Sequence, residues 1–209
     1  MSTPYLDSGR SAQKWRTREA LVESARELVR AGETPTVERA AERASVSRTT
    51  AYRYFVNQRE LLLAAHPETG VGSMLGADPP ADAADRLAEV ISRFTRLIVD
   101  TEAAQRTMLR VSLETGSDDG QPLPLRQGRA ISWIAEALTP LEDVLAPAEV
   151  ERLVLAIRSC TGIEALVWLT DVAGLTSTEA AETMQWSARS LLYAATTAGP
   201  PPVRPGERG

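Results

Sequence analysis

The fold is decided by residues 36–55, TVERAAERASVSRTTAYRYF. Apolar residues recur there at helical spacing in two short runs, 37–44 and 48–55, which three residues separate. Thr36 and Ser47 stand directly before the two runs, and both residue types are favoured N-caps. Two short amphipathic helices joined by a tight turn predict a helix-turn-helix, the unit that sets its second helix into the major groove of DNA.

The outward face of the second helix carries side chains that suit DNA. Arg48 and Arg53 can reach guanine edges or phosphates, and Thr49 and Thr50 offer short hydroxyls. A purely structural helical hairpin would show the same apolar pattern. The caps, the length of the break and the basic exposed face together favour DNA binding over that alternative.

Helical patterns continue through the rest of the chain, and strand patterns are nearly absent. Residues 148–172 are apolar almost all round, so we expect both faces of that helix to be covered. The sequence predicts an all-α protein of about nine helices, with an N-terminal three-helix domain that contains the helix-turn-helix and a larger helical domain for ligand binding and dimerisation. Beyond the helix-turn-helix, the expected helices are 16–31, 58–66, 84–98, 101–114, 130–138, 148–172 and 178–197.

Proline- and glycine-rich stretches divide the chain into five predicted segments. The cations of the first segment suit either a solvated tail or a contact with the DNA minor groove, and the sequence does not decide between them. The segments are a flexible basic arm (1–15), a DNA-binding domain (16–66), a linker (67–80), an effector-binding and dimerisation domain (81–197) and a disordered tail (198–209).

The distribution of charge along the chain supports a nucleic-acid partner, although the net charge of the whole chain is negative. The net charge is −5, but residues 1–66 hold eleven Lys or Arg against eight Asp or Glu, whereas residues 67–209 hold twelve against twenty. The single Cys160 cannot form an internal disulfide, and the first fifteen residues lack the apolar core of a signal peptide. We therefore expect a cytoplasmic protein with no membrane partner.

The run 36–55 resembles the DNA-binding region of the tetracycline-repressor (TetR) family. The similarity covers about residues 17–65, and the matching positions are Thr36, Val37, Ala41, Ala44, Val46, Ser47, Tyr52, Phe55, Leu61 and Leu62. The resemblance implies that Thr36, Tyr52 and Tyr54 contact phosphates. It also implies that Arg48, Thr49, Thr50 and Arg53 lie in or beside the groove, and Ser47 and Gln58 complete the predicted DNA-binding set. The resemblance further implies a homodimer formed through the last two helices, with an effector pocket enclosed by the middle ones.

Two positions depart from the family pattern. Ser45 stands where the family often has Gly, at a turn position that can require a positive φ, so we expect either mild strain or a slightly different turn there. Gln58 stands where Lys is common, so a charged phosphate contact becomes a neutral hydrogen bond.

Large or charged side chains on the later helices are candidates for the effector pocket. Aromatic residues at helical spacing more often belong to a core or an interface, and a charge inside an apolar helix can equally form a structural salt bridge. Both alternatives stay open. The candidates are Phe94, Met108, Arg110, Trp133, Glu164, Trp168 and Asp171.

These observations predict a one-component transcriptional regulator, a repressor that binds a pseudo-palindromic operator as a homodimer and is released by an unknown small-molecule effector. We expect no cofactor, no metal site and no catalysis, because one His and one Cys far apart supply little material for an enzyme. The alternatives are a helical ligand-binding or carrier protein without DNA binding, and an enzyme that uses Glu164 or Asp171 as a base.

Overall fold

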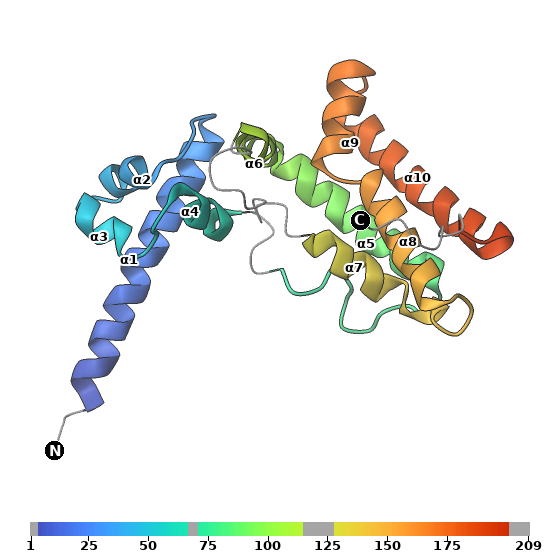
Figure 1. Ribbon diagram of the computed structural model, residues 1–209, viewed down its shortest axis with the longest axis horizontal. Helices are drawn as coiled ribbons and strands as arrows, with labels where there is room; N and C mark the ends of the chain where they lie inside the picture. Colours follow the sequence, from blue (N-terminus) through green and yellow to red (C-terminus); the bar gives the residue numbers. More distant parts are fainter. Residues whose placement is uncertain (1–3, 67–70, 115–127, 201–209) are drawn as a thin grey trace, which may run out of the picture. The chain divides into compact units, whose positions relative to one another are not determined.

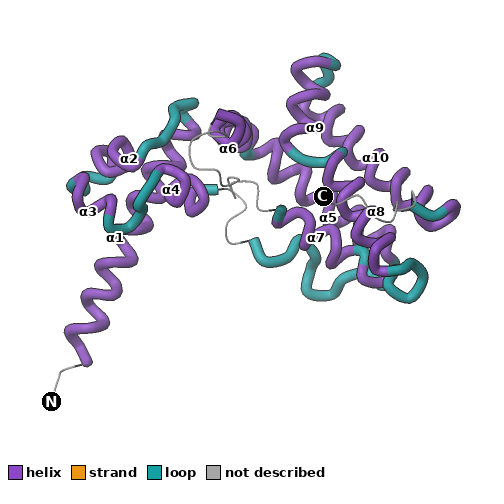
Figure 2. The backbone as a smooth tube through the Cα atoms, in the orientation of Figure 1, coloured by secondary structure: helices purple, strands orange, loops and turns teal. Residues whose placement is uncertain are grey.

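The computed structural model describes residues 4–66, 71–114 and 128–200. These residues are helical or lie in connecting turns, 74% of the chain is helix, and the described part contains no strand (Figure 2). The prediction of an all-α fold with about nine helices is confirmed. The chain forms two compact units, the first made of Met1–Gly70 with Thr101–Gln127 and the second of Val71–Asp100 with Gly128–Gly209.

The first unit is built on α1 (Pro4–Arg30), against which α2 (Val37–Arg43) and α4 (Gln58–Ala65) pack. The short helix α3 (Arg48–Tyr52) packs on α2. Their apolar faces meet in one core, because each helix carries small or branched residues at helical spacing. The buried members are Leu21, Val22, Ala25, Val37, Ala40, Ala41, Ala51, Phe55, Leu61 and Ala65.

Helix α1 begins at Pro4, not near Arg16 as the sequence analysis expected (Figure 1). Residues 4–15, assigned to a flexible arm, are therefore helical. Proline suits a first helical position, and the polar residues that follow are compatible with continuing the helix once its later turns are packed. The side chains of residues 11–16 are exposed, so this part of α1 protrudes beyond the core.

The first unit also contains α6 (Glu102–Glu114), which the sequence analysis placed in the second domain. Met108 of α6 is buried against Val29 of α1 and Leu62 of α4. Arg110 donates a hydrogen bond of 2.7 Å to the hydroxyl of Thr34. The amphipathic pattern predicted the helix correctly, but it could not show which of two apolar cores the helix would join.

The second unit packs α5 (Ala83–Asp100) along α10 (Ser177–Ala198), and α7 (Arg129–Ala137) lies between α5 and α8 (Pro147–Ser159) (Figure 1). A 3-10 turn, η2 (Thr139–Leu141), follows α7. The core is filled by large side chains from all four helices, including Leu87, Ile91, Phe94, Ile98, Trp133, Ile134, Leu153, Ile157, Met184 and Leu192.

The expected single helix 148–172 is divided into three parts. After α8 the chain turns at 160–162, and it resumes as α9 (Ile163–Val167) and a π-helical turn, η3 (Trp168–Val172). Gly162 has φ 125°, which L side chains rarely adopt. Nor do the described residues cover both faces, because Leu155, Trp168 and Val172 are exposed at 48%, 58% and 70%.

Arg158 occupies the space beside Gly162. Its guanidinium donates to the Thr161 carbonyl oxygen at 2.6 Å, forms an ion pair with Glu164 at 3.3 Å and lies 5.9 Å from the centre of the Phe94 ring. A Cβ on Gly162 would come within 2.3 Å of its Nη1 atom. The glycine therefore permits both the turn and the close approach of this side chain.

The described part of the expected linker, residues 71–80, packs on the second unit. Met74 and Leu75 are buried, and the Gly72 carbonyl accepts a hydrogen bond from the Trp133 indole. These two apolar side chains explain why the segment is held against the helices. The remainder of the linker and residues 201–209 of the expected tail lie outside the described residues.

Within the described ranges, one stretch is long and apolar enough to cross a membrane by length and composition, Pro147–Val172. Core helices of soluble proteins pass the same test. The stretch is also interrupted by the turn at 160–162, so the finding is consistent with a soluble protein.

Candidate nucleic-acid interface

The capping predicted for the helix-turn-helix is confirmed. The Thr36 hydroxyl accepts from the backbone N–H of Arg39 at 3.2 Å, and the Ser47 hydroxyl accepts from that of Thr50 at 3.2 Å. Asn57 caps α4 in the same way by accepting from the backbone of Glu60 at 2.9 Å. Helices α2, α3 and α4 thus each have an N-terminal donor satisfied by the helix's own cap, which fixes where the helix begins.

The turn between α2 and α3 has the strain expected at Ser45. Its φ is 54°, and it is the one non-glycine residue in the described part of the chain with a positive φ. Backbone bonds hold it there, since the Ser45 N–H donates to the Glu42 carbonyl and the Val46 N–H to the Ala41 carbonyl at 2.8 Å. The left-handed conformation aims α3 away from the axis of α2.

Helix α3 is supported on one side and open on the others. Ala51 is its one buried residue, and Phe55 just beyond it is also buried. Thr49 and Arg53 are exposed on the opposite side, four residues apart and therefore on one face. Arg53 lies at the end of the helix and Tyr54 beyond it, because α3 stops at Tyr52 and not at Phe55 as expected.

One flank of α3 faces Glu38 of α2. The Glu38 carboxylate accepts hydrogen bonds from the Arg48 guanidinium at 2.9 Å and from the Tyr52 hydroxyl at 2.5 Å. The Arg48 guanidinium also lies 5.7 Å from the centre of the Tyr52 ring. Two of the side chains predicted to meet DNA are therefore bound to one carboxylate. The sequence analysis did not identify Glu38.

The hydrogen bond between Glu38 and Tyr52 changes both acidities. It is the largest cause of a lowered pKa for the Glu38 carboxyl and of a raised pKa for the Tyr52 phenol. Hydrogen bonding to a carboxylate favours its charged form. Glu38 thus keeps its negative charge to a lower pH than an ordinary glutamate does.

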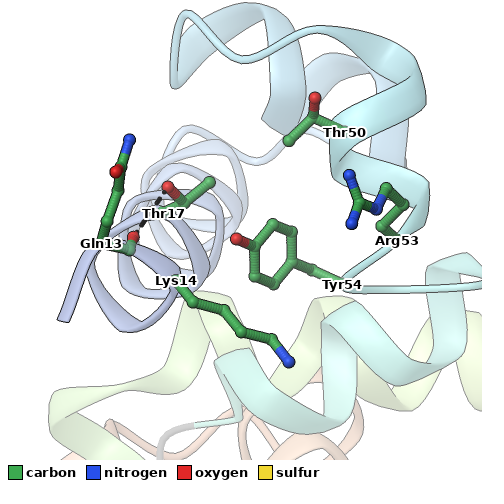
Figure 3. Close-up of a pocket in the computed structure, with 6 residues that line it drawn as sticks. All are labelled: Gln13, Lys14, Thr17, Thr50, Arg53 and Tyr54. Carbon is green, nitrogen blue, oxygen red and sulfur yellow. Dashed lines mark hydrogen bonds between the residues drawn. The ribbon is translucent and has the colours of Figure 1, made fainter. Parts of the chain in front are cut away.

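The other flank of α3 faces α1 across an open cleft (Figure 3). The cleft has a volume of about 530 Å³. Its lining comes from Gln13, Lys14 and Thr17 of α1 and from Thr50, Arg53 and Tyr54 at α3. The Tyr54 ring lies in the middle of this group, with its hydroxyl toward α1 (Figure 3).

Thr36 and Gln58, the remaining predicted DNA contacts, stand at helix starts. Thr36 is half-buried and its hydroxyl is used for capping, and Gln58 is the half-buried first residue of α4. Helix N-termini present unpaired backbone N–H groups, which suit phosphate. Both positions therefore fit backbone contacts better than contacts with base edges.

The structure does not gather the seven predicted effector residues in one place. Met108 and Arg110 lie in the first unit. Phe94 and Trp133 are buried together in the second, their ring centres 5.8 Å apart in an edge-to-face arrangement, so they form core.

Glu164 and Trp168 line a shallow hollow of about 340 Å³ between α9 and α10. Glu164 is paired there with Arg158. Asp171 is exposed and accepts a hydrogen bond from Thr170 at 2.9 Å. The remaining lining residues of the hollow are Ser159, Cys160, Ala165, Leu169, Thr183, Met184 and Ser187.

Among the described residues, no group of three His, Cys, Asp or Glu is placed to hold a metal ion. Comparison of the chain with protein-family models finds no match, and comparison with curated proteins finds none either.

Proposed function

We propose that this chain is a one-component transcriptional regulator of the tetracycline-repressor type. It acts in the cytoplasm as a homodimer, represses transcription by binding a pseudo-palindromic duplex operator, and leaves the operator when a small molecule binds its second unit. The observation that carries the proposal is the capped helix α3, whose side chains other than Ala51 reach the surface and include Arg48, Thr49 and Thr50. This composition and exposure fit a recognition helix.

Exposed apolar side chains on the last helices support the dimer. Trp186 and Tyr193 are seven residues apart on α10, hence on one face, and are exposed at 63% and 71%. Trp168 and Val172 form a second such pair on the preceding segment. Large apolar residues grouped in this way mark interaction surfaces, and an isologous interface would cover the same residues on both protomers.

The small-molecule part of the proposal is supported by the hollow beside Glu164 and Trp168. It offers an aromatic wall, a carboxylate and the hydroxyls of Thr183 and Ser187, a combination that suits a ligand with one apolar face and polar substituents. Differential binding of about 1 to 3 kcal/mol between two conformations is sufficient for induction.

The test begins with selection of bound fragments from the genomic DNA of the source organism. Fluorescence anisotropy then compares wild type with Arg48→Ala and Tyr52→Ala on a selected duplex, and we expect each variant to lose at least tenfold in affinity. Arg96→Ala, which removes an exposed cation from α5 of the second unit, is the matched control and should bind normally.

Unchanged affinity in both α3 variants would refute the recognition helix. A chain that ignores duplex DNA even at low ionic strength would instead fit the helical carrier protein. Sedimentation equilibrium of the wild type measures its mass in solution and so tests for the dimer. A strictly monomeric particle would refute that part of the proposal.

A further inference from the structure

We infer that the cleft between α1 and α3 binds a phosphodiester of the DNA backbone beside the base pairs that α3 meets. This inference deepens the proposed function and rests on it. It assigns a binding role to the N-terminal turns of α1, for which the sequence left a solvated tail and a minor-groove contact open.

Two cations of the first unit, Lys14 and Arg53, face the cleft without a carboxylate partner in the part of the chain that the structure describes. Most of its arginines are bound to carboxylates, as Arg26 and Arg30 are to Glu23 and Arg43 is to Glu27 at 2.6 Å. Lys14 and Arg53 form no ion pair with any described residue, and neither has a carboxylate beside it in the cleft lining. Two cations that share a cleft without an acid make it attractive to an anion.

The cleft also contains neutral hydrogen-bond donors. Gln13 brings an amide, and the Thr50 hydroxyl accepts from Ser47 at 2.8 Å, so its own proton is available to donate. The Thr17 hydroxyl is already used, because it donates to the Gln13 carbonyl at 3.0 Å (Figure 3). Lys14, Arg53, Gln13 and Thr50 thus line the cleft with donors to which the several oxygens of a phosphodiester and its sugars could bond.

The cleft lies where α1 and the predicted recognition element meet. Thr50 and Arg53 belong to the predicted recognition element, whereas Gln13 and Lys14 belong to the protruding turns of α1. A hollow of about 530 Å³ is larger than one phosphate group and open to solvent on one side, as a phosphodiester with its adjoining sugars requires. The cleft would bind the backbone of the DNA strand that borders the major groove. Such a contact fixes the orientation of α3 but carries no information about the base sequence.

Salt dependence of duplex binding measures this contact. Each phosphate contact contributes about 0.9 to the slope of log affinity against log salt concentration, so Lys14→Gln should lower the slope of the dimer by about 1.8. Arg16→Gln is the matched control. It removes the same charge from α1 two residues further on, on the other side of the helix and outside the cleft.

Lys14 is the only lysine in the chain, which allows a direct measurement at the cleft. Reductive methylation with ¹³C-formaldehyde keeps the charge and labels the Lys14 amine together with the N-terminus, and the Lys14→Gln protein identifies the Lys14 signal. We expect duplex DNA to shift that signal at concentrations at which inorganic phosphate alone does not.

The outcomes separate the inference from the function on which it rests. Equal slopes for Lys14→Gln and Arg16→Gln, or a Lys14 signal that duplex DNA leaves in place while the protein binds, would overturn the phosphodiester site and leave the regulator intact. A signal that inorganic phosphate shifts and duplex DNA does not would also overturn it. A protein that binds no duplex at all would refute the proposed function itself.

Discussion

Glu38→Gln should tighten DNA binding. In the structure the Glu38 carboxylate is bonded to Arg48 at 2.9 Å and to Tyr52, and both of these side chains must turn to a duplex for the proposed contacts to form. The carboxylate also stands close to where phosphates would lie, and like charges repel. The amide is nearly isosteric, so the substitution removes the charge with little change in packing.

The expected gain in DNA affinity follows from how exposed the Arg48–Glu38 ion pair is. The Arg48 side chain is 72% exposed and that of Glu38 36%. Pairs exposed to this degree shift an equilibrium by between about 1.4-fold and fivefold. Two protomers bind, so releasing both arginines should raise affinity by about two- to thirtyfold. Mild acid will not have the same effect, because the hydrogen bond from Tyr52 lowers the pKa of Glu38 and keeps it charged.

The assay is fluorescence anisotropy on a selected duplex at two salt concentrations. Glu23→Gln is the matched control, since it removes a carboxylate of α1 that pairs with Arg26 and Arg30 and touches no predicted DNA contact. Weaker binding by Glu38→Gln, with a normal melting temperature, would refute the reasoning. It would mean that Glu38 holds Arg48 in its binding position.

Three further predictions concern stability and reactivity. Ser45→Gly should raise the free energy of unfolding by up to about 1 kcal/mol, because relief of the left-handed strain exceeds the entropy cost of glycine, whereas Ser45→Val should lower it; equal urea midpoints for the two would contradict this. Gly162→Ala should cost about 1 to 3 kcal/mol because Arg158 must leave its bonds, and Gly174→Ala, with open space around it, should cost less. Burial raises the pKa of the Cys160 thiol, so iodoacetamide should alkylate it at pH 8 more slowly in the folded protein than in urea, as measured by mass spectrometry; equal rates would show that the thiol is accessible.

Local chemistry explains which parts of the fold were predictable. Caps at Thr36 and Ser47 and the positive φ of Ser45 depend on neighbouring residues, and the sequence predicted all three. Where the sequence has no strong capping signal, the predicted start of a helix was less accurate. The start of α1 at Pro4 is an example, because nothing in residues 4–15 requires a helix and only the packed turns that follow extend it.

Features that depend on distant residues were not predictable from pattern. The partnership of Glu38 with Arg48 joins residues ten positions apart on two helices, and a helix pattern only marks Glu38 as exposed. The burial of Met108 against Val29 and the division of the expected helix at 160–162 are of the same kind. Gly162 was the one sequence signal for this division. The apolar residues on both sides of Gly162 favoured a continuous helix in the sequence analysis, so the division was missed.

The central claim is that the surface of α3 binds duplex DNA, and Thr49→Asp tests it most directly. Thr49 is exposed and lies opposite the buried Ala51, so a carboxylate there should leave the melting temperature unchanged while repelling phosphates. On a selected duplex in low salt, we expect affinity to fall by at least tenfold. A folded Thr49→Asp protein that binds the duplex as tightly as wild type would contradict the account.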